Sequence, residues 1–328
     1  MSLFFLMCSE RSGSNFISKL INGHNNVCGP STKHVINPVA RNLFRYGDIS
    51  KKKNWESLLN DIYRLISVEF SVLKKCFSYE ELRNLAVPGD IKSLIQNIFL
   101  EESRENGKQH VFIKENHVYE FLPFLLTYFP EAKFVYQTRD PRDMALSWKK
   151  NSDHPGGVVN AARQWQRDQQ QSLKNYHLLE KEGKAHFVKY ENLTANNEVE
   201  IKNIFEFLGV PFDKGVFEFH KDEVTQKNAK TQKAWSNLSQ GVISDNSQKY
   251  RSELSESEVK VVEKICWHEM TFLGYEPEHS KDVIDDVDEG MLARLEDEER
   301  RIPVKRSSGV VENMAAKKRF YQHINLDS

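Results

Sequence analysis

The sequence predicts an α/β fold in which a central, mostly parallel sheet is flanked by helices. Short, continuous apolar runs alternate along the chain with longer segments of helical periodicity. This alternation is typical of βαβ units with right-handed crossovers. The chain has 328 residues, and 20 Phe, 11 Tyr and 5 Trp are enough to build a sizeable core. With about 150 residues per domain as a guide, this length fits one large domain or two small ones.

The strands are expected where apolar runs are short and uninterrupted. The first run is Leu3–Cys8, which leads through a glycine-containing turn into apolar residues at helical spacing over residues 16–21. Three more strands are expected over residues 111–113, 133–138 and 186–190.

Helices are expected between and after these strands. Residues 50–110 should be mostly helical, and a helix should follow the third strand and run through Trp148. The other helices are expected over residues 118–129, 158–182, 198–208 and 254–273. Ser255 and Glu258 have the spacing of a capping box at the start of the last one.

The composition changes along the chain predict how it is organised. Residues 1–278 are expected to form one domain, with a helical insertion at about residues 40–110 and a polar loop over 213–250 that could act as a substrate lid. Residues 279–328 are expected to be a charged C-terminal extension. Nine acids and two bases occupy residues 281–299, whereas seven bases and one acid occupy residues 300–319. Homo-oligomer formation is one role open to this extension.

Charge and cysteine usage exclude several functional classes. Lys and Arg (46) nearly balance Asp and Glu (47), so the overall field gives no reason to expect nucleic acid or a lipid surface as partner. The four cysteines are scattered without metal-ligand spacing, so we expect no metal and a reducing compartment. The longest apolar run, Leu3–Cys8, is far too short to cross a membrane, and no Lys or Arg precedes it as in a signal peptide. These features predict a soluble, cytoplasmic protein.

Two turns carry the residues expected to bind an anion. The first, Arg11-Ser12-Gly13-Ser14-Asn15, lies between the first strand and its helix, where free N–H groups and the helix dipole favour a phosphate or sulfate. The second contains Arg139 and is followed by Ser147 on the next helix. In open α/β sheets ligands lie beyond the carboxyl ends of the strands, so both turns should meet at one edge. Because the GxxxxGK[ST] motif is absent, a P-loop kinase or NTPase is the less favoured alternative.

These turns carry a family resemblance. Residues 5–15, FLMCSERSGSN, resemble the 5′-phosphosulfate loop of the bacterial-type, soluble sulfotransferases that use 3′-phosphoadenosine 5′-phosphosulfate (PAPS). Residues 134–147, FVYQTRDPRDMALS, resemble their 3′-phosphate motif. The segments 188–193, 207–212 and 247–251 also resemble family segments, so that the likeness covers roughly residues 3–275. It implies a P-loop-like three-layer fold.

The resemblance implies transfer of a sulfuryl group from PAPS, as co-substrate, to a hydroxyl or amine of a small-molecule or saccharide acceptor. Arg11, Ser12, Gly13, Ser14 and Asn15 would hold the 5′-phosphosulfate. The residues expected around the 3′-phosphate and the nucleotide are Arg139, Ser147, Arg251 and Tyr190.

The catalytic residues follow from what sulfuryl transfer requires. Positioned cations should stabilise the leaving phosphate, and Arg11 and Lys114 can supply them without a metal. A general base near neutral pKa favours His. His34 matches the histidine of a bacterial family segment, His117 is its rival and Glu115 is a third candidate. A non-catalytic nucleotide-binding scaffold is the other alternative, and the identity of the acceptor is not encoded in these motifs.

Overall fold

The computed structural model describes residues 2–71, 73–231 and 233–322. At its centre is a five-stranded, fully parallel sheet in the order β2-β3-β1-β4-β5. The strands are β1 Leu3–Cys8, β2 Val27–Cys28, β3 His110–Lys114, β4 Lys133–Thr138 and β5 Ala185–Lys189. Four of them lie where the apolar runs predict strands. The two-residue β2 is too short to leave a pattern in the sequence.

The register of the sheet brings the ends of three strands together. Leu6 of β1 lies opposite Lys114 of β3, and Cys8 of β1 lies opposite Gln137 of β4. The segments that follow β1, β3 and β4 therefore leave the sheet side by side at its carboxyl edge.

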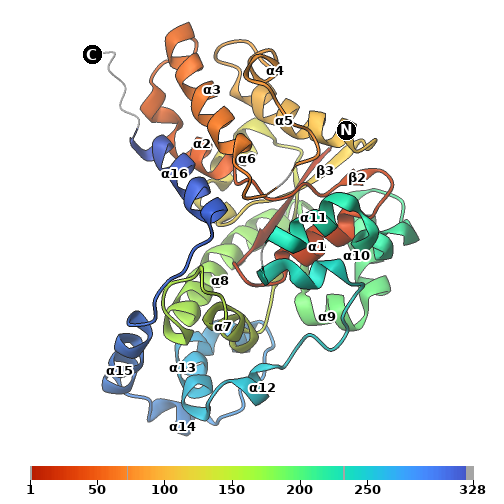
Figure 1. Ribbon diagram of the computed structural model, residues 1–328. Helices are drawn as coiled ribbons and strands as arrows, with labels where there is room; N and C mark the ends of the chain where they lie inside the picture. The colour runs from red at the N-terminus through yellow and green to blue at the C-terminus, as the bar shows by residue number, and fades with distance from the viewer. Residues whose placement is uncertain (1, 72, 232, 323–328) are drawn as a thin grey trace.

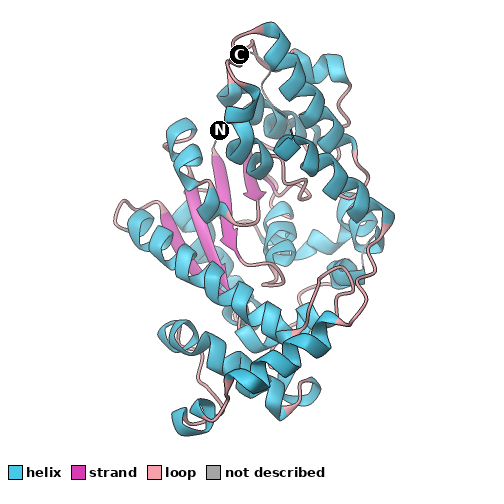
Figure 2. Cartoon of the chain, turned by 90° about the vertical axis from the view of Figure 1, so that its left-hand side faces the viewer, coloured by secondary structure: helices cyan, strands magenta, loops and turns pink. Residues whose placement is uncertain are grey.

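Helices cover both faces of the sheet, which gives three layers (Figures 1 and 2). Successive residues of β1 point to opposite faces, so Phe4 packs in one core and Phe5 in the other. The core around Phe4 is completed by α1 Ser14–Asn22, α10 Asn197–Leu208 and η3 Lys214–Lys221. The core around Phe5 receives residues from α2 Ile36–Asn42, η1 Leu43–Tyr46, α3 Lys52–Ser67, α4 Tyr79–Arg83, α5 Ile91–Glu105, η2 Val118–Glu120 and α6 Leu122–Tyr128.

A third apolar cluster lies beyond the sheet, in the lower part of Figure 1. It is formed by α7 Pro141–Lys149, α8 Val158–Glu180 and α13 Glu256–Phe272. The predicted capping box is present, because Ser255 accepts a hydrogen bond from the Glu258 N–H and Glu258 accepts one from the Ser255 N–H. The short helices near this cluster and after β5 are α9 Tyr190–Ala195, α12 Tyr250–Glu253, α14 Lys281–Asp285 and α15 Glu289–Arg300.

The segment 213–250, which the sequence predicts as a polar loop, holds three short helices. They are η3, α11 Glu223–Thr231 and η4 Lys233–Ser239. Val216 and Phe219 of η3 are fully buried against α1. A 3₁₀-helix repeats every three residues and short helices give few repeats, so the sequence shows no helical periodicity here.

The end of the chain returns to the main body. We call residues 302–322 the C-terminal strap; it crosses from α15 to the upper helices and ends in α16 Ser308–Gln322 (Figure 1). Phe320 is fully buried in the Phe5 core, and the Arg319 guanidinium lies 2.6 Å from the Asp61 carboxylate. Glu299, just before the strap, accepts hydrogen bonds from the first N–H groups of α8. The predicted extension is thus packed on the domain, and its self-association stays a prediction.

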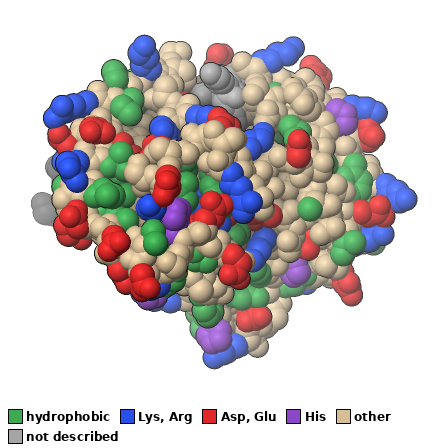
Figure 3. Space-filling view, turned by 90° about the horizontal axis from the view of Figure 1, so that it is seen from below, with side chains coloured by type: hydrophobic (Ala, Val, Ile, Leu, Met, Phe, Trp, Pro, Cys, Tyr) green, Lys and Arg blue, Asp and Glu red, His purple; other side chains and the backbone are tan. Residues whose placement is uncertain are grey.

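The face of the molecule seen from below carries no patch of a single charge (Figure 3). Acidic and basic side chains are intermixed over the face shown in Figure 3. Within the described ranges, no helix has both the length and the apolar character needed to cross a bilayer.

Candidate active site

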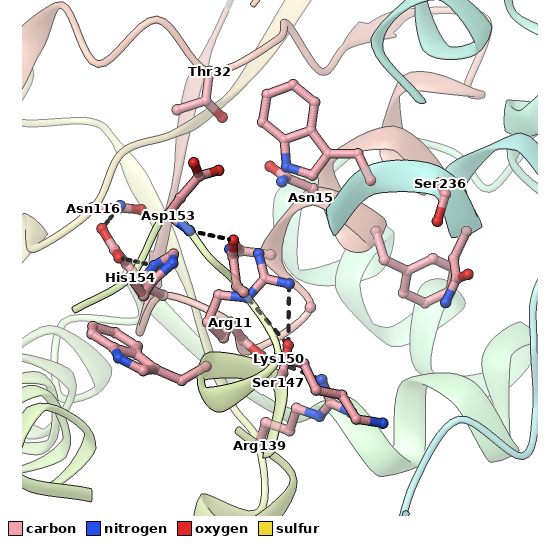
Figure 4. Close-up of a pocket in the computed structure, with 18 of the residues that line it drawn as sticks. Arg11, Asn15, Thr32, Asn116, Arg139, Ser147, Lys150, Asp153, His154 and Ser236 are labelled. Atoms are coloured by element: carbon pink, nitrogen blue, oxygen red, sulfur yellow. Dashed lines mark hydrogen bonds and ion pairs between the residues drawn. The ribbon is translucent and has the colours of Figure 1, made fainter. Parts of the chain in front are cut away.

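A cavity of about 960 Å³ opens at the carboxyl edge of the sheet. Its walls come from the turns after β1, β3 and β4, from α7 and the loop after it, from the segment 213–250 and from the C-terminal strap. Figure 4 shows Arg139 and Ser147 at one end of the view, Arg11 beside them and Thr32 at the opposite end. The structure therefore joins segments far apart in the sequence around one space.

The first turn forms a close-fitting cradle at the start of α1. Gly13 precedes the helix with a φ of 85°, and a Cβ there would lie 2.3 Å from the Tyr190 ring. Only glycine fits both the left-handed backbone and the contact with the ring. Ser14 and Asn15 line the cavity, whereas Ser12 is fully buried and its hydroxyl donates to the Ser9 carbonyl. Ser12 thus contributes to the cradle through its backbone.

The two predicted basic turns meet through Arg11. Its Nε and Nη2 each donate to the Ser147 hydroxyl at 3.1 Å, across 136 residues of sequence (Figure 4). Burial and the neighbouring Arg139 lower the pKa of Arg11 to about 10, so it stays cationic at neutral pH. Two guanidinium groups whose charges act on each other favour an anion between them, in addition to the carboxylates of Glu10 and Asp153 that act on Arg11.

Arg139 is buried with one donor unused. Its Nη1 donates to the Arg11 carbonyl at 3.3 Å and its Nη2 to the Asn246 carbonyl at 3.2 Å. Its guanidinium stacks 4.5 Å from the centre of the Tyr190 ring, and the Tyr190 hydroxyl accepts from the Asn246 amide. The buried Nε of Arg139 has no hydrogen-bond partner in the described part of the chain. A buried, unpaired N–H is costly unless a ligand accepts from it.

The structure does not bring Arg251 into the cavity. Its guanidinium lies 2.8 Å from the Glu278 carboxylate, and more than half of the side chain is exposed. Lys249 lines the cavity instead, in a segment fixed by Asp143, which accepts from the Gln248 N–H. Lys249 lies in the same basic segment of the sequence, but only the fold shows which of its two cations faces inward.

Lys114 and Glu10 both line the cavity. Lys114, at the end of β3, is only 9% exposed, and burial lowers its pKa. The Glu10 carboxylate accepts from Asn116 at 2.6 Å and pairs with His154 Nε2 at 2.8 Å (Figure 4). Burial alone would raise the pKa of Glu10, but the His154 hydrogen bond and nearby cations hold it at about 2. His154, on the loop after α7, carries no motif that marks it in the sequence.

His34 lines the cavity and lies beside the buried Glu115. His34 Nδ1 lies 3.4 Å from Glu115 Oε2, and Glu115 Oε1 accepts from the Ile36 N–H at 3.0 Å. Burial keeps the pKa of His34 well below its usual value, so the ring is neutral at pH 7. Burial also raises the pKa of Glu115 to about 7. Because Nδ1 faces Glu115, Nε2 is the nitrogen left for a group in the cavity.

His117, the rival base, lies outside the cavity lining. Its Nε2 is 3.9 Å from Asp168 Oδ1, and its ring packs against Tyr119 with centroids 5.6 Å apart. Asp168 in turn accepts from the Tyr119 hydroxyl at 2.8 Å. The geometry thus favours His34 over His117 for contact with a substrate.

No group of three or more metal-ligating side chains occurs among the residues that the structure describes. The charged side chains that line the cavity include cations of the two basic turns, Arg11 and Arg139, together with Lys114 and the acidic Glu10 and Asp153.

The sequence matches the family model described as "Sulfotransferase family" over residues 4–214. The chain belongs to the sulfotransferase family. A search of the curated proteins found no match. The matched range of this sulfotransferase contains both basic turns and the His34–Glu115 pair, whereas most of the segment 213–250 and the whole strap lie outside it.

Solved structures give the same fold. The sulfotransferase domain from the curacin biosynthetic pathway is 17% identical, with a TM-score of 0.56, and the match covers 84% of this chain and 98% of that one. The sulfotransferase domain of the Synechococcus PCC 7002 olefin synthase is 16% identical, with a TM-score of 0.54, and the match covers 81% and 94%. The predicted family and the predicted three-layer fold are confirmed; the roles of the site residues stay predictions.

Proposed function

We propose that this protein transfers a sulfuryl group from PAPS to a hydroxyl or amine of a small-molecule or saccharide acceptor. The observation that carries the proposal is the junction of the two basic turns, where Arg11 donates to Ser147 and Arg139 keeps a buried Nε unpaired. One cavity thereby offers two adjacent sites for anionic groups, as a nucleotide with phosphates at both its 3′ and 5′ positions requires.

The residues present fit such a donor. Gly13, Ser14 and Asn15 would hold the 5′-phosphosulfate at the start of α1, where helix N–H groups lack partners within the helix. Arg139 and Ser147 would hold the 3′-phosphate. Tyr190, whose ring stacks on Arg139, would line the nucleotide-binding part of the cavity. We call this part of the cavity the nucleotide end. When bound, PAPS supplies the sulfuryl group on a phosphate leaving group.

The cations at the nucleotide end serve the chemistry as well as the binding. Negative charge develops on the leaving phosphate in the transition state, and cations fixed in advance stabilise it most where water is excluded. Lys114 and Arg11 are both largely buried and both line the cavity. They can therefore act on the leaving phosphate without a metal ion.

His34 is the proposed general base. Its Nε2 accepts the proton of the acceptor hydroxyl as the oxygen–sulfur bond forms, and Nδ1 then shares its proton with Glu115. A neutral imidazole is required for this step, and burial keeps His34 neutral. We call the region around His34 the acceptor end of the cavity.

The free, buried thiols of Cys8, Cys28 and Cys266 support a reducing, cytoplasmic location.

Turnover with labelled PAPS tests the proposal. The purified protein, incubated with ³⁵S-labelled PAPS and a panel of phenols, alcohols, amines and sugars, should release adenosine 3′,5′-bisphosphate (PAP) and label one acceptor class. PAP binding without transfer to any acceptor would favour the non-catalytic scaffold. Magnesium-dependent ATP hydrolysis with no PAP binding would favour the kinase or NTPase alternative.

A further inference from the structure

The C-terminal strap forms one wall of the cavity although it lies outside the range that matches the family model. It contributes Lys305, Arg306, Ser307, Val310, Asn313, Met314 and Lys317 to the lining. The three charged residues among these are all cations, whereas the strap's one acidic residue, Glu312, is exposed. The wall that the strap adds is therefore positively charged.

The strap is held firmly enough to position these side chains. Ala316 and Phe320 are buried in the Phe5 core, where α16 packs against α2 and α3. The Arg319–Asp61 ion pair fixes the same helix to α3. Lys317, between these anchors, is consequently carried on a rigid element and not on a free tail.

Lys317 lies at the acceptor end of the cavity. The carboxylates that act on its ammonium are first Glu115 and then Glu10, and its charge in turn acts on His34. The charge of Lys114, at the end of β3, also acts on it. Lys317 thus lines the same cavity as the proposed base and lies close enough to Glu115 and His34 for their charges to interact.

Two polar groups on this wall have no protein partner. Asn313 is only 4% exposed, lines the cavity, and its Nδ2 has no hydrogen-bond partner in the described ranges. No hydrogen bond or ion pair joins the half-buried Lys317 ammonium to the described part of the chain. Buried donors are normally satisfied, so the unpaired amide of the buried Asn313 indicates a ligand that accepts from it, and the Lys317 ammonium on the same wall favours a ligand with negative charge.

An apolar surface lies near these donors. Phe70 and Trp235 both line the cavity and pack edge to face with centroids 5.6 Å apart, and Val310 and Met314 of the strap add aliphatic surface. A ligand that contacts this wall therefore meets cations and an amide beside aromatic and aliphatic side chains.

We propose that the C-terminal strap determines acceptor specificity: Lys317 and Asn313 bind an anionic group, such as a carboxylate, phosphate or sulfate, on an acceptor whose apolar part packs on Phe70 and Trp235. This inference rests on the proposed function, since it assigns the acceptor side of the same cavity. The strap cations could alternatively contact the anionic nucleotide, and the experiment separates these two sources of negative charge.

The test measures binding of matched acceptor pairs to the full-length protein saturated with PAP. Each pair has the same hydroxyl-bearing aromatic skeleton and differs only in charge, for example 4-hydroxyphenylacetate and its methyl ester. We expect the anionic member to bind at least tenfold more tightly to the wild-type protein, as measured by calorimetry. Lys317→Met should abolish that difference and Lys317→Arg should keep it. Lys318→Met, which removes an exposed cation one residue along, is the matched control and should leave it intact.

The outcomes are distinct. Equal binding of both members of every pair to the wild-type protein, or a difference that persists in Lys317→Met, overturns the proposal. A Lys317→Met protein that binds PAP tenfold more weakly but keeps the acceptor preference assigns the strap to the nucleotide and also overturns it. Failure of the wild-type protein to bind PAP refutes the proposed function itself. Lys317→Glu supplies a second check, because it should reverse the preference toward an aminated acceptor while PAP affinity shows that the fold is intact.

Discussion

The two ends of the cavity are built in different ways. At the nucleotide end, each basic turn directly follows a strand of the sheet, so a few consecutive residues carry strand, turn and helix start. His34, by contrast, shares the cavity with the segment 213–250 and the C-terminal strap, which follow it by about 180 or more residues and lie almost entirely outside the family match. The comparison teaches that the anion-binding turns are positioned by the sheet, whereas the segments that we propose to determine acceptor specificity are packed around it.

The largest expected effect is on turnover, at the acceptor end. His34→Ala removes the proposed base and should lower kcat by roughly 10²–10⁴-fold, the range usual for a general base. PAP affinity should stay within about twofold, because the nucleotide end is untouched. His117→Ala is the matched control and should change kcat far less, since His117 contacts Asp168 and Tyr119 outside the cavity lining. Steady-state kinetics that show the reverse order would transfer the role to His117.

The strap anchor should matter for acceptor turnover and for stability. Phe320→Ala empties a fully buried site and should cost about 3–5 kcal/mol of unfolding free energy if the strap unfolds with the rest. If the strap detaches alone, acceptor turnover is lost while PAP affinity is kept. Denaturant unfolding and calorimetry with PAP distinguish the two. Tyr321→Ala, at a neighbouring half-exposed position, should cost less than about 1 kcal/mol. Unchanged stability and turnover in Phe320→Ala would show that the strap is dispensable.

The nucleotide end should respond to loss of a single cation. Arg139→Ala removes a buried guanidinium and should weaken PAP binding roughly 100-fold, the size usual when one partner of a buried charged contact is lost. Arg251→Ala is the control, because Arg251 pairs with Glu278 away from the cavity and should leave PAP affinity unchanged. Calorimetric titration measures both. A larger loss in Arg251→Ala would mean that the basic segment rearranges over the nucleotide.

The cradle at the start of α1 should not tolerate a side chain at position 13. Gly13→Ala places a Cβ on a residue with positive φ and against the Tyr190 ring. It should lower the free energy of unfolding by about 1–3 kcal/mol and weaken PAP binding about tenfold. Gly107→Ala is the control for the effect of positive φ alone, because Gly107 has a similar φ of 67° but no atom lies within 4 Å of the added Cβ. Thermal unfolding and PAP titration of both variants separate strain from crowding. Equal PAP affinity in the two variants would contradict the proposed role of the cradle.

The smallest expected effect is a change in pH dependence. Burial raises the pKa of Glu115 to about 7, so the His34–Glu115 pair gains a proton as the pH falls through 7. That proton lowers the capacity of His34 to accept another, and kcat should therefore decline below about pH 7. In Glu115→Gln the decline should move to lower pH, toward the lowered pKa of His34, with a smaller maximal rate. A pH–rate profile that does not move would separate Glu115 from catalysis.

The nucleotide end could be predicted from the sequence because its parts are local. A buried strand, a glycine with basic and hydroxyl neighbours and a helix start are contiguous near Gly13, and a strand, a basic turn and a helix start are likewise contiguous at Arg139. Their meeting through Arg11 and Ser147 followed from the rule that parallel strands present their carboxyl ends at one edge.

The rest depends on tertiary contacts that no local pattern encodes. Whether Lys249 or Arg251 faces the cavity is set by Asp143, more than 100 residues earlier in the chain. His154 becomes part of the site through Glu10, 144 residues away. The sequence predicts a charged extension because cations dominate the composition of the strap. The burial of Phe320 and Ala316 against α2 and α3, which helps to hold the strap beside the cavity, is a tertiary contact that this composition does not show.

The central claim is that the junction of Arg11, Ser147 and Arg139 recognises a nucleotide with a 3′-phosphate. Calorimetric titration of the wild-type protein and of Arg139→Ala with PAP and with adenosine 5′-monophosphate, which lacks only the 3′-phosphate, tests it directly. The wild-type protein should bind PAP roughly 100-fold more tightly than the monophosphate, and Arg139→Ala should bind the two about equally. Equal affinities for the two nucleotides in the wild-type protein would contradict the claim.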